Sequence, residues 1–186
     1  NMVPQDAEAV VEVKDGEATI KAFEAYLETQ PVTGKATLDG KTVSFAVVGQ
    51  ASHGASPANG INAATYLADF LNTLDFEKDA KTFLQVIATY LHENSDGKKL
   101  AIDHNDELMG ELTANFGIFR FEDGADNYVD ANMRFPQGTD ADTILAQFKE
   151  TIKEENVKAE IVGLSKEPHY VPKDDPLVET LLNVYH

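Results

Sequence analysis

The 186-residue sequence contains no cysteine, which excludes a disulfide framework, a cysteine-ligated metal cluster and a thiol nucleophile. Basic residues are scarce, because 15 lysines and arginines stand against 32 aspartates and glutamates, a net charge of −17. This imbalance argues against binding to nucleic acid or to an anionic membrane surface, since both require clustered positive charge. No apolar run approaches the roughly 18 residues of a membrane-spanning helix, and no signal-peptide pattern opens the chain. We therefore expect a cytoplasmic protein.

Sequence motifs of common catalytic centres are also missing. The five histidines show no metal-ligand spacing, and neither a glycine-rich phosphate loop nor a Gly-x-Ser-x-Gly elbow occurs. The acidic residues are so numerous that any pair of them is a weak signal. We expect no complete catalytic centre and no metal site in this segment. The chain starts at Asn1 and stops at His186 inside a predicted helix, as an excised part of a longer protein would.

Hydrophobic periodicity and turn residues predict strands and helices in alternation. Two strand pairs are joined by Asp-Gly turns, the strongest short signal for a hairpin. The predicted strands are Ala7–Val13, Lys35–Leu38, Thr42–Val48, Leu112–Phe121, Tyr128–Phe135 and Val157–Leu164. The predicted helices are Glu17–Thr29, a helix after Pro57, Asp79–Glu93, Ala141–Glu155 and, beginning at Pro176, Leu177–Tyr185. Asn94–Asp106 is predicted as a loop and Pro168–Asp175 as an extended segment.

A strand pair followed by a helix occurs twice, which predicts an α+β fold with antiparallel sheets covered by helices. Two ferredoxin-like halves, residues 1–75 and 76–167, would fit this order. Residues 168–186 would then leave the domain as a short stub.

The best candidate for chemistry is His53 in the sequence GQASHGASPANGINA, residues 49–63. A predicted strand leads His53 into a loop of small residues, which allow a ligand to approach closely. An imidazole can donate a hydrogen bond to developing negative charge. A surface histidine without a function is the alternative.

The second candidate is Arg134 in Asn132-Met133-Arg134-Phe135-Pro136, at the end of a predicted strand. It is one of only two arginines in the chain, and a guanidinium there is suited to bidentate binding of a carboxylate. The alternative is an edge arginine that pairs with one of the many acidic side chains.

The loop around His53 resembles the signature of the lid domain in co-catalytic zinc peptidases of the aminoacylase and carboxypeptidase-G type. The dipeptidase V, Xaa-His dipeptidase and carnosinase-like branch is the most similar. Four further segments are similar in the same order along the chain: residues 1–9, 112–119, 132–136 and 168–178.

The resemblance implies a lid inserted into a catalytic domain that holds two zinc ions, with no zinc expected in this fragment. It implies that His53 stabilises the oxyanion, that Arg134 binds the substrate's C-terminal carboxylate and that Asn1 contacts substrate. Asn1 is terminal and could instead be a cloning remnant. The enlarged lid also implies a monomer that acts on dipeptides together with its own catalytic domain. Two alternatives remain: a ferredoxin-like small-molecule-binding or dimerisation module, and the lid of a related deacylase or desuccinylase.

Overall fold

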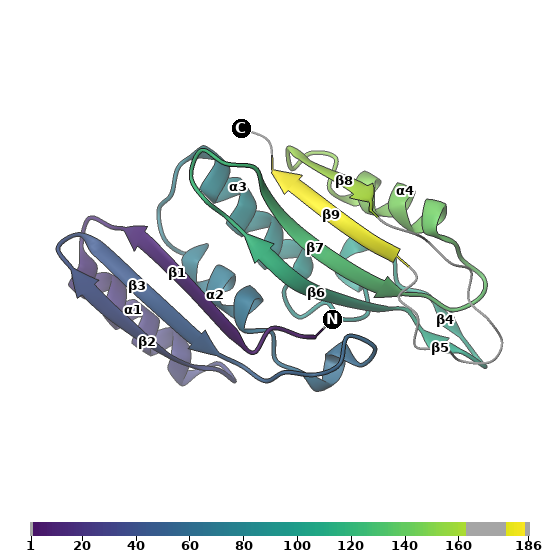
Figure 1. Ribbon diagram of the computed structural model, residues 1–186, viewed down its shortest axis with the longest axis horizontal. Coiled ribbons are helices and arrows are strands. Elements are labelled where there is room, and N and C mark those ends of the chain that lie inside the picture. The colour runs from purple at the N-terminus through teal and green to yellow at the C-terminus, as the bar shows by residue number, and fades with distance from the viewer. Residues whose placement is uncertain (1, 163–177, 185–186) are drawn as a thin grey trace.

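Two antiparallel sheets lie side by side in the computed structural model, which describes residues 2–162 and 178–184 (Figure 1). The first sheet has the order β1-β3-β2 and consists of β1 (Asp6–Glu12), β2 (Thr33–Asp39) and β3 (Thr42–Val48). Helices α1 (Gly16–Glu28) and α2 (Ala63–Leu71) cover one face of it (Figure 1). The other face of this sheet carries no helix in the described part of the chain.

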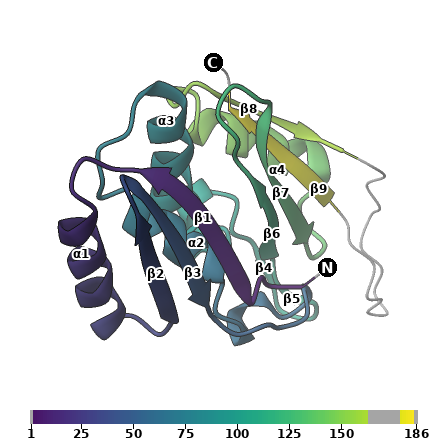
Figure 2. The same cartoon turned by 60° about the vertical axis from the view of Figure 1, so that its left-hand side comes forward.

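The second sheet has the order β6-β7-β9-β8. Its strands are β6 (Thr113–Arg120), β7 (Asn127–Arg134), β8 (Val157–Ile161) and β9 (Val178–Val184). Its helical side holds α3 (Lys78–Val86), the π-helical turn η2 (Ile87–Leu91) and α4 (Ala141–Thr151). Short elements complete the chain: η1 (Pro57–Asn59), η3 (Lys98–Leu100), β4 (Asn105–Asp106) and β5 (Gly110–Glu111). Both sheets therefore present one helix-free face on the same side of the molecule (Figures 1 and 2).

Local sequence signals explain where several elements begin and turn. Asp15 caps α1 by accepting a hydrogen bond from the Ala18 amide at 3.0 Å, and Asp140 caps α4 in the same way. Gly40 has φ +63 in the turn between β2 and β3, a conformation that glycine adopts without a steric penalty. Gly124 has φ +79 between β6 and β7, so both predicted hairpins are confirmed at their Asp-Gly turns.

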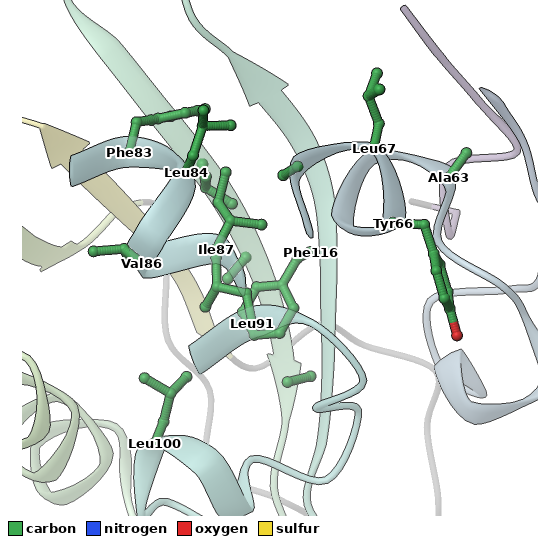
Figure 3. Close-up of a cluster of buried hydrophobic side chains, with 14 of the residues drawn as sticks. Ala63, Tyr66, Leu67, Phe83, Leu84, Val86, Ile87, Leu91, Leu100 and Phe116 are labelled. Atoms are coloured by element: carbon green, nitrogen blue, oxygen red, sulfur yellow. The ribbon is translucent and has the colours of Figure 1, made fainter. Parts of the chain in front are cut away.

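The core is apolar and runs beneath both sheets. Three aromatic rings, Phe23, Phe45 and Phe70, meet with centroids 5.0–5.7 Å apart under the first sheet. Under the second sheet, side chains of α3, η2 and η3 pack towards Phe116 of β6 (Figure 3). Tyr66 and Leu67 of α2 belong to the same cluster, so the two layers share one core.

The predicted helix Leu177–Tyr185 is wrong, because Val178–Val184 is strand β9 between β7 and β8. β7 and β8 run parallel to each other with room for one strand between them, and both pair with β9 in antiparallel register. The backbone hydrogen bonds of two neighbouring strands outweigh the weak helical tendency of a seven-residue segment. The sequence Val-Glu-Thr-Leu-Leu-Asn-Val also suits a strand, since β-branched residues favour extended backbone.

Two further predictions need adjustment. The helix predicted for Asp79–Glu93 is α3 followed by the π-helical turn, and it ends at Leu91. The loop predicted for Asn94–Asp106 contains η3 and half of the β4–β5 hairpin. The predicted α+β class with antiparallel sheets is confirmed. The boundaries 1–75, 76–167 and 168–186 stay predictions, and Pro168–Asp175 lies outside the described residues. In the described part, no helix combines the length and the apolar character needed to span a membrane.

Candidate functional site

The loop that carries His53 is closed at its base by two backbone hydrogen bonds. The Gln50 amide donates to the Ile61 carbonyl at 2.9 Å, and the Ile61 amide donates to the Gln50 carbonyl at 2.8 Å. Glycine is required beside this closure, because a Cβ at Gly49 would lie 2.2 Å from the Ile61 oxygen. A Cβ at Gly60 would lie 2.9 Å from the Cβ of Ser52. The small residues in this part of the sequence thus allow two backbone segments to approach closely.

Inside the loop, His53 has a defined orientation. The Ala55 amide donates to His53 Nδ1 at 3.0 Å, and the Ser56 amide donates to the His53 carbonyl at 2.9 Å. Ser52 Oγ donates to the Ser56 carbonyl at 2.8 Å and tightens the same turn. Because Nδ1 accepts a hydrogen bond, the neutral imidazole carries its proton on Nε2. The exposed side chain therefore offers an N–H donor to a ligand.

The N-terminal segment lies against the His53 loop. The Val3 amide donates to the Ser52 carbonyl at 2.8 Å, and Met2 forms an isolated antiparallel bridge with His53. This pairing places Met2 beside the backbone of His53. Asn1, the predicted substrate contact, lies outside the described residues.

Arg134 is the last residue of β7 and lies on the helix-free face of the second sheet. Its neighbours Met133 and Phe135 are buried, whereas Arg134 itself is half-buried, as alternation along a strand requires. In the register of β6 and β7, Arg134 stands opposite Thr113, and Asn132 stands opposite Asn115. A row of polar side chains thus lies at the end of the sheet that is nearest to Met2.

The β4–β5 hairpin braces the chain just after Arg134. Gln137 Nε2 donates to Asp106 Oδ1 at 3.2 Å, and His104 Nε2 lies 3.2 Å from the Gln137 carbonyl oxygen. The backbone amide of Met109 donates to the Asp106 carboxylate, which lowers the pKa of Asp106, and Gln137 lowers this pKa further. These contacts fix the segment that follows the arginine.

The His53 loop and the Arg134 strand are joined through Met2. Asn115 Nδ2 donates to the Met2 carbonyl at 3.3 Å, and Met2 pairs with His53. A chain of contacts through Met2 and Asn115 thus links the loop that carries His53 with the strand pair that carries Arg134, although 81 positions separate these two residues in the sequence. Sequence reasoning missed Asn115. Its position on the polar side of an alternating strand was the available signal.

Two buried polar atoms of β6 have no hydrogen-bond partner among the described residues. They are Thr113 Oγ1 and Asn115 Oδ1. Both atoms belong to β6, where Thr113 stands directly opposite Arg134 and Asn115 stands opposite Asn132.

A cavity of about 250 Å³ lies beneath the His53 loop, between η1, α2 and β6. Its polar lining includes Asn62, Tyr66, Glu93 and Asn115. Asn62 caps α2 by accepting from the Ala64 amide at 3.0 Å, and its Nδ2 donates to the Phe116 carbonyl at 2.8 Å. This side chain therefore connects a helix of the first layer with the edge strand of the second sheet.

His92 lies next to this cavity and has a structural environment. Its Nδ1 is 2.9 Å from Thr65 Oγ1, and its Nε2 is 3.3 Å from Glu93 Oε1. The Tyr66 ring meets it edge-on at 4.3 Å. Burial lowers the pKa of His92, although the carboxylates of Asp69 and Glu93 act in the opposite direction. A neutral, buried histidine in such a network is a packing and hydrogen-bonding residue.

Comparison with known proteins gives a consistent result. A family described as the peptidase dimerisation domain, M20, matches residues 39–160. The chain is 37% identical over 185 residues to the Beta-Ala-Xaa dipeptidase of Lactobacillus delbrueckii subsp. lactis. It is 36% identical over 186 residues to a Staphylococcus saprophyticus protein that carries a provisional dipeptidase name. Each match covers 100% of this chain and 39% of the relative. The chain thus spans about two fifths of the length of these relatives.

Proposed function

Because the chain belongs to the M20 peptidase dimerisation domain family, we propose that it forms the lid of a zinc-dependent dipeptidase and presents His53 and Arg134 to a bound dipeptide. One observation carries the proposal: the Met2 backbone pairs with His53 and is hydrogen-bonded to the strand pair that ends at Arg134. A donor and a cation held in one region match a substrate that has a scissile carbonyl and a nearby terminal carboxylate.

His53 acts in this proposal as a hydrogen-bond donor to the oxyanion. Its Nδ1 accepts from the Ala55 amide, so Nε2–H is directed to the substrate without a change of tautomer. A donor that is already oriented contributes most where charge develops in the transition state. Loss of one such donor typically reduces turnover by about 10²–10³-fold.

Arg134 acts as the carboxylate-binding residue. A guanidinium forms two parallel hydrogen bonds with a carboxylate, and charged hydrogen bonds contribute about 1.5–3 kcal/mol. This interaction would select peptides with a free C-terminus. Asn1, beside Met2, is proposed as a further substrate contact.

The zinc ions implied by the family resemblance do not fit this part of the chain. Within the described ranges, no group of three histidine, aspartate or glutamate side chains could hold a metal ion. We propose that residues of the catalytic domain hold them and that this chain alone is inactive. Closure of the lid over that domain would exclude water and complete the site. We also propose that the protein is a monomer. Its chain contains two sheet-and-helix layers, which would take the places of the two single lids that pair in a dimer.

The test uses the full-length enzyme that carries this chain, with a dipeptide and its C-terminal amide as substrates. We expect His53→Ala to reduce kcat for the dipeptide by about 10²–10³-fold while metal content is unchanged. We expect Arg134→Ala to reduce kcat/KM for the dipeptide by about 10–100-fold and to leave the amide unaffected, because the amide has no carboxylate to bind.

Arg120→Ala is the matched control, since Arg120 lies on the same sheet at the opposite end of the β6–β7 pair. It should behave as the wild type. Unchanged turnover in His53→Ala, or equal losses for dipeptide and amide in Arg134→Ala, would refute the assignment. Hydrolysis of N-acyl amino acids in preference to dipeptides would instead identify a deacylase lid.

A further inference from the structure

Asn115 lies between the two proposed substrate-binding residues without touching either of them in the described contacts. It is 2% exposed, on the edge strand β6 of the second sheet. Its Nδ2 donates to the carbonyl of Met2, which is the residue that bridges to His53. One side-chain amide therefore connects the His53 loop to the β6–β7 strand pair.

Gly117 gives the Met2 backbone room to reach that amide. A Cβ at Gly117 would lie 3.3 Å from the Met2 carbonyl oxygen and 3.3 Å from Asn115 Nδ2. The register of β6 and β7 is irregular between Phe116 and Ile118, so Gly117 occupies a bulge. A bulge typically bends the strand and redirects neighbouring groups. Asn115 and Gly117 together form a clamp on Met2, and we use the name Met2 clamp for these two residues.

The same strand pair positions Arg134. Asn115 is opposite Asn132 in the register, and Arg134 is two residues beyond Asn132 on the same face. Diagonal neighbours of this kind in an antiparallel pair are about 7–8 Å apart. A shift of Met2 at the clamp would move the His53 loop relative to Arg134, because Val3 and Met2 are both bonded to the loop.

The side-chain amide of Asn115 does what an apolar side chain in the same place could not do. Its Nδ2 donates to the Met2 carbonyl, and only a donor can hold that oxygen. The amide thus fixes the Met2 backbone relative to β6.

We propose that Asn115 is a positioning residue whose clamp on Met2, together with Gly117, sets the separation of His53 and Arg134 and so limits hydrolysis to substrates with one α-residue after the scissile bond. The inference rests on the proposed roles of His53 and Arg134. One extended residue spans about 3.3–3.6 Å, and a misplacement of about 1 Å can cost 10²-fold in rate. A fixed separation therefore discriminates Ala-Ala from Ala-β-Ala, in which one methylene is added, and from Ala-Ala-Ala.

The experiment measures kcat and KM for these three peptides in the full-length enzyme. Asn115→Ala should reduce kcat for Ala-Ala by about 10–100-fold with a smaller change in KM, because binding to Arg134 persists while alignment is lost. The ratio of kcat/KM for Ala-Ala over Ala-β-Ala should fall at least tenfold. Asn115→Asp keeps the size of the side chain but removes the donor, so it should resemble the alanine variant.

Gly117→Ala provides a second perturbation, because the added methyl group would lie 3.3 Å from both the Met2 carbonyl oxygen and Asn115 Nδ2 and so disturbs the clamp without removing the amide. It should also reduce the Ala-Ala over Ala-β-Ala ratio. Asn127→Ala is the matched control: Asn127 is a buried asparagine at the far end of β7, where its Oδ1 accepts from the Glu122 amide at 2.7 Å. This control should lose stability and keep the wild-type selectivity.

The inference is overturned if folded Asn115→Asp and Gly117→Ala both keep the wild-type selectivity ratio. It is equally overturned if Asn127→Ala changes that ratio to the same extent, since the effect would then follow stability alone. Failure of the proposed function looks different, because His53→Ala and Arg134→Ala would then hydrolyse Ala-Ala at the wild-type rate.

Discussion

Replacement of Asn62 by alanine should destabilise the protein far more than a typical surface substitution. The side chain makes two kinds of contact: Oδ1 accepts from the Ala64 and Thr65 amides at 3.0 and 3.2 Å, and Nδ2 donates to the Phe116 carbonyl at 2.8 Å. Loss of an N-cap costs about 0.5–2 kcal/mol. A buried carbonyl left without its donor costs about 1–3 kcal/mol more.

Together these contributions predict a loss of about 1.5–5 kcal/mol in the free energy of unfolding. For a domain of this size, 1 kcal/mol corresponds to about 2–4 °C, so Tm should fall by about 3–20 °C. Thermal unfolding followed by circular dichroism, with urea titration at 25 °C, measures both quantities. Asn62→Asp should fall between wild type and alanine, because aspartate keeps the cap but cannot donate to Phe116.

Asn59→Ala is the control, because Asn59 is exposed in the same loop and its described hydrogen bonds involve only its backbone: the carbonyl accepts from Gln50 Nε2 and the amide donates to the Ser56 carbonyl. It should change stability by less than about 0.5 kcal/mol. A Tm of Asn62→Ala within 2 °C of the control would refute the reasoning. It would show that α2 and β6 are held together by apolar packing alone.

Three further outcomes follow from the packing. Burial lowers the pKa of His92 below its ordinary value of 6.5, so the unfolded chain binds the proton more readily and the free energy of unfolding should fall as pH drops below about 6.5. His92→Gln should reduce this pH dependence in urea titrations from pH 7.5 to 5. An unchanged pH dependence would assign it to other groups. Gly49→Ala should lower Tm by several degrees, because its Cβ would clash with the Ile61 carbonyl, and a neutral effect would mean that the loop base adjusts freely. Phe70→Ala, which removes the ring shared by the aromatic cluster, should cost about 3–5 kcal/mol, and a loss below 1 kcal/mol would contradict a tightly packed core.

The sequence predicted what depends on neighbours along the chain. The Asp-Gly turn at Gly40 and the amphipathic helix α1 were found because their signals lie within a few residues. β9 was predicted as a helix because the strands that pair with it, β7 and β8, are distant from it in the sequence. Hydrogen bonding to the edges of these two strands favours the extended conformation. Local helix and strand propensities do not depend on such distant partners.

The candidate site was likewise predictable only where its signals are local in the sequence. The small residues around His53 and the isolated arginine at position 134 were visible in the sequence. The connection between the elements that carry them was not visible, because it depends on a hydrogen bond between Asn115 and Met2, residues 113 positions apart. The closest sequence signal was the alternation of β6, which placed Asn115 on a polar face but could not identify its partner.

The paired hydrogen bonds between Gln50 and Ile61 close the loop below its exposed tip, which consists of Ala58 and Asn59. Since the base of the loop is held independently of its tip, changes at the exposed Ala58 and Asn59 leave the sheet and α2 intact. Doubling the length of a flexible loop costs only about 0.6 kcal/mol in closure entropy. Insertions between Ala58 and Asn59 should therefore be tolerated, because the Gln50–Ile61 pair and the contacts of Ser52 and His53 with Val3 and Met2 stay in place.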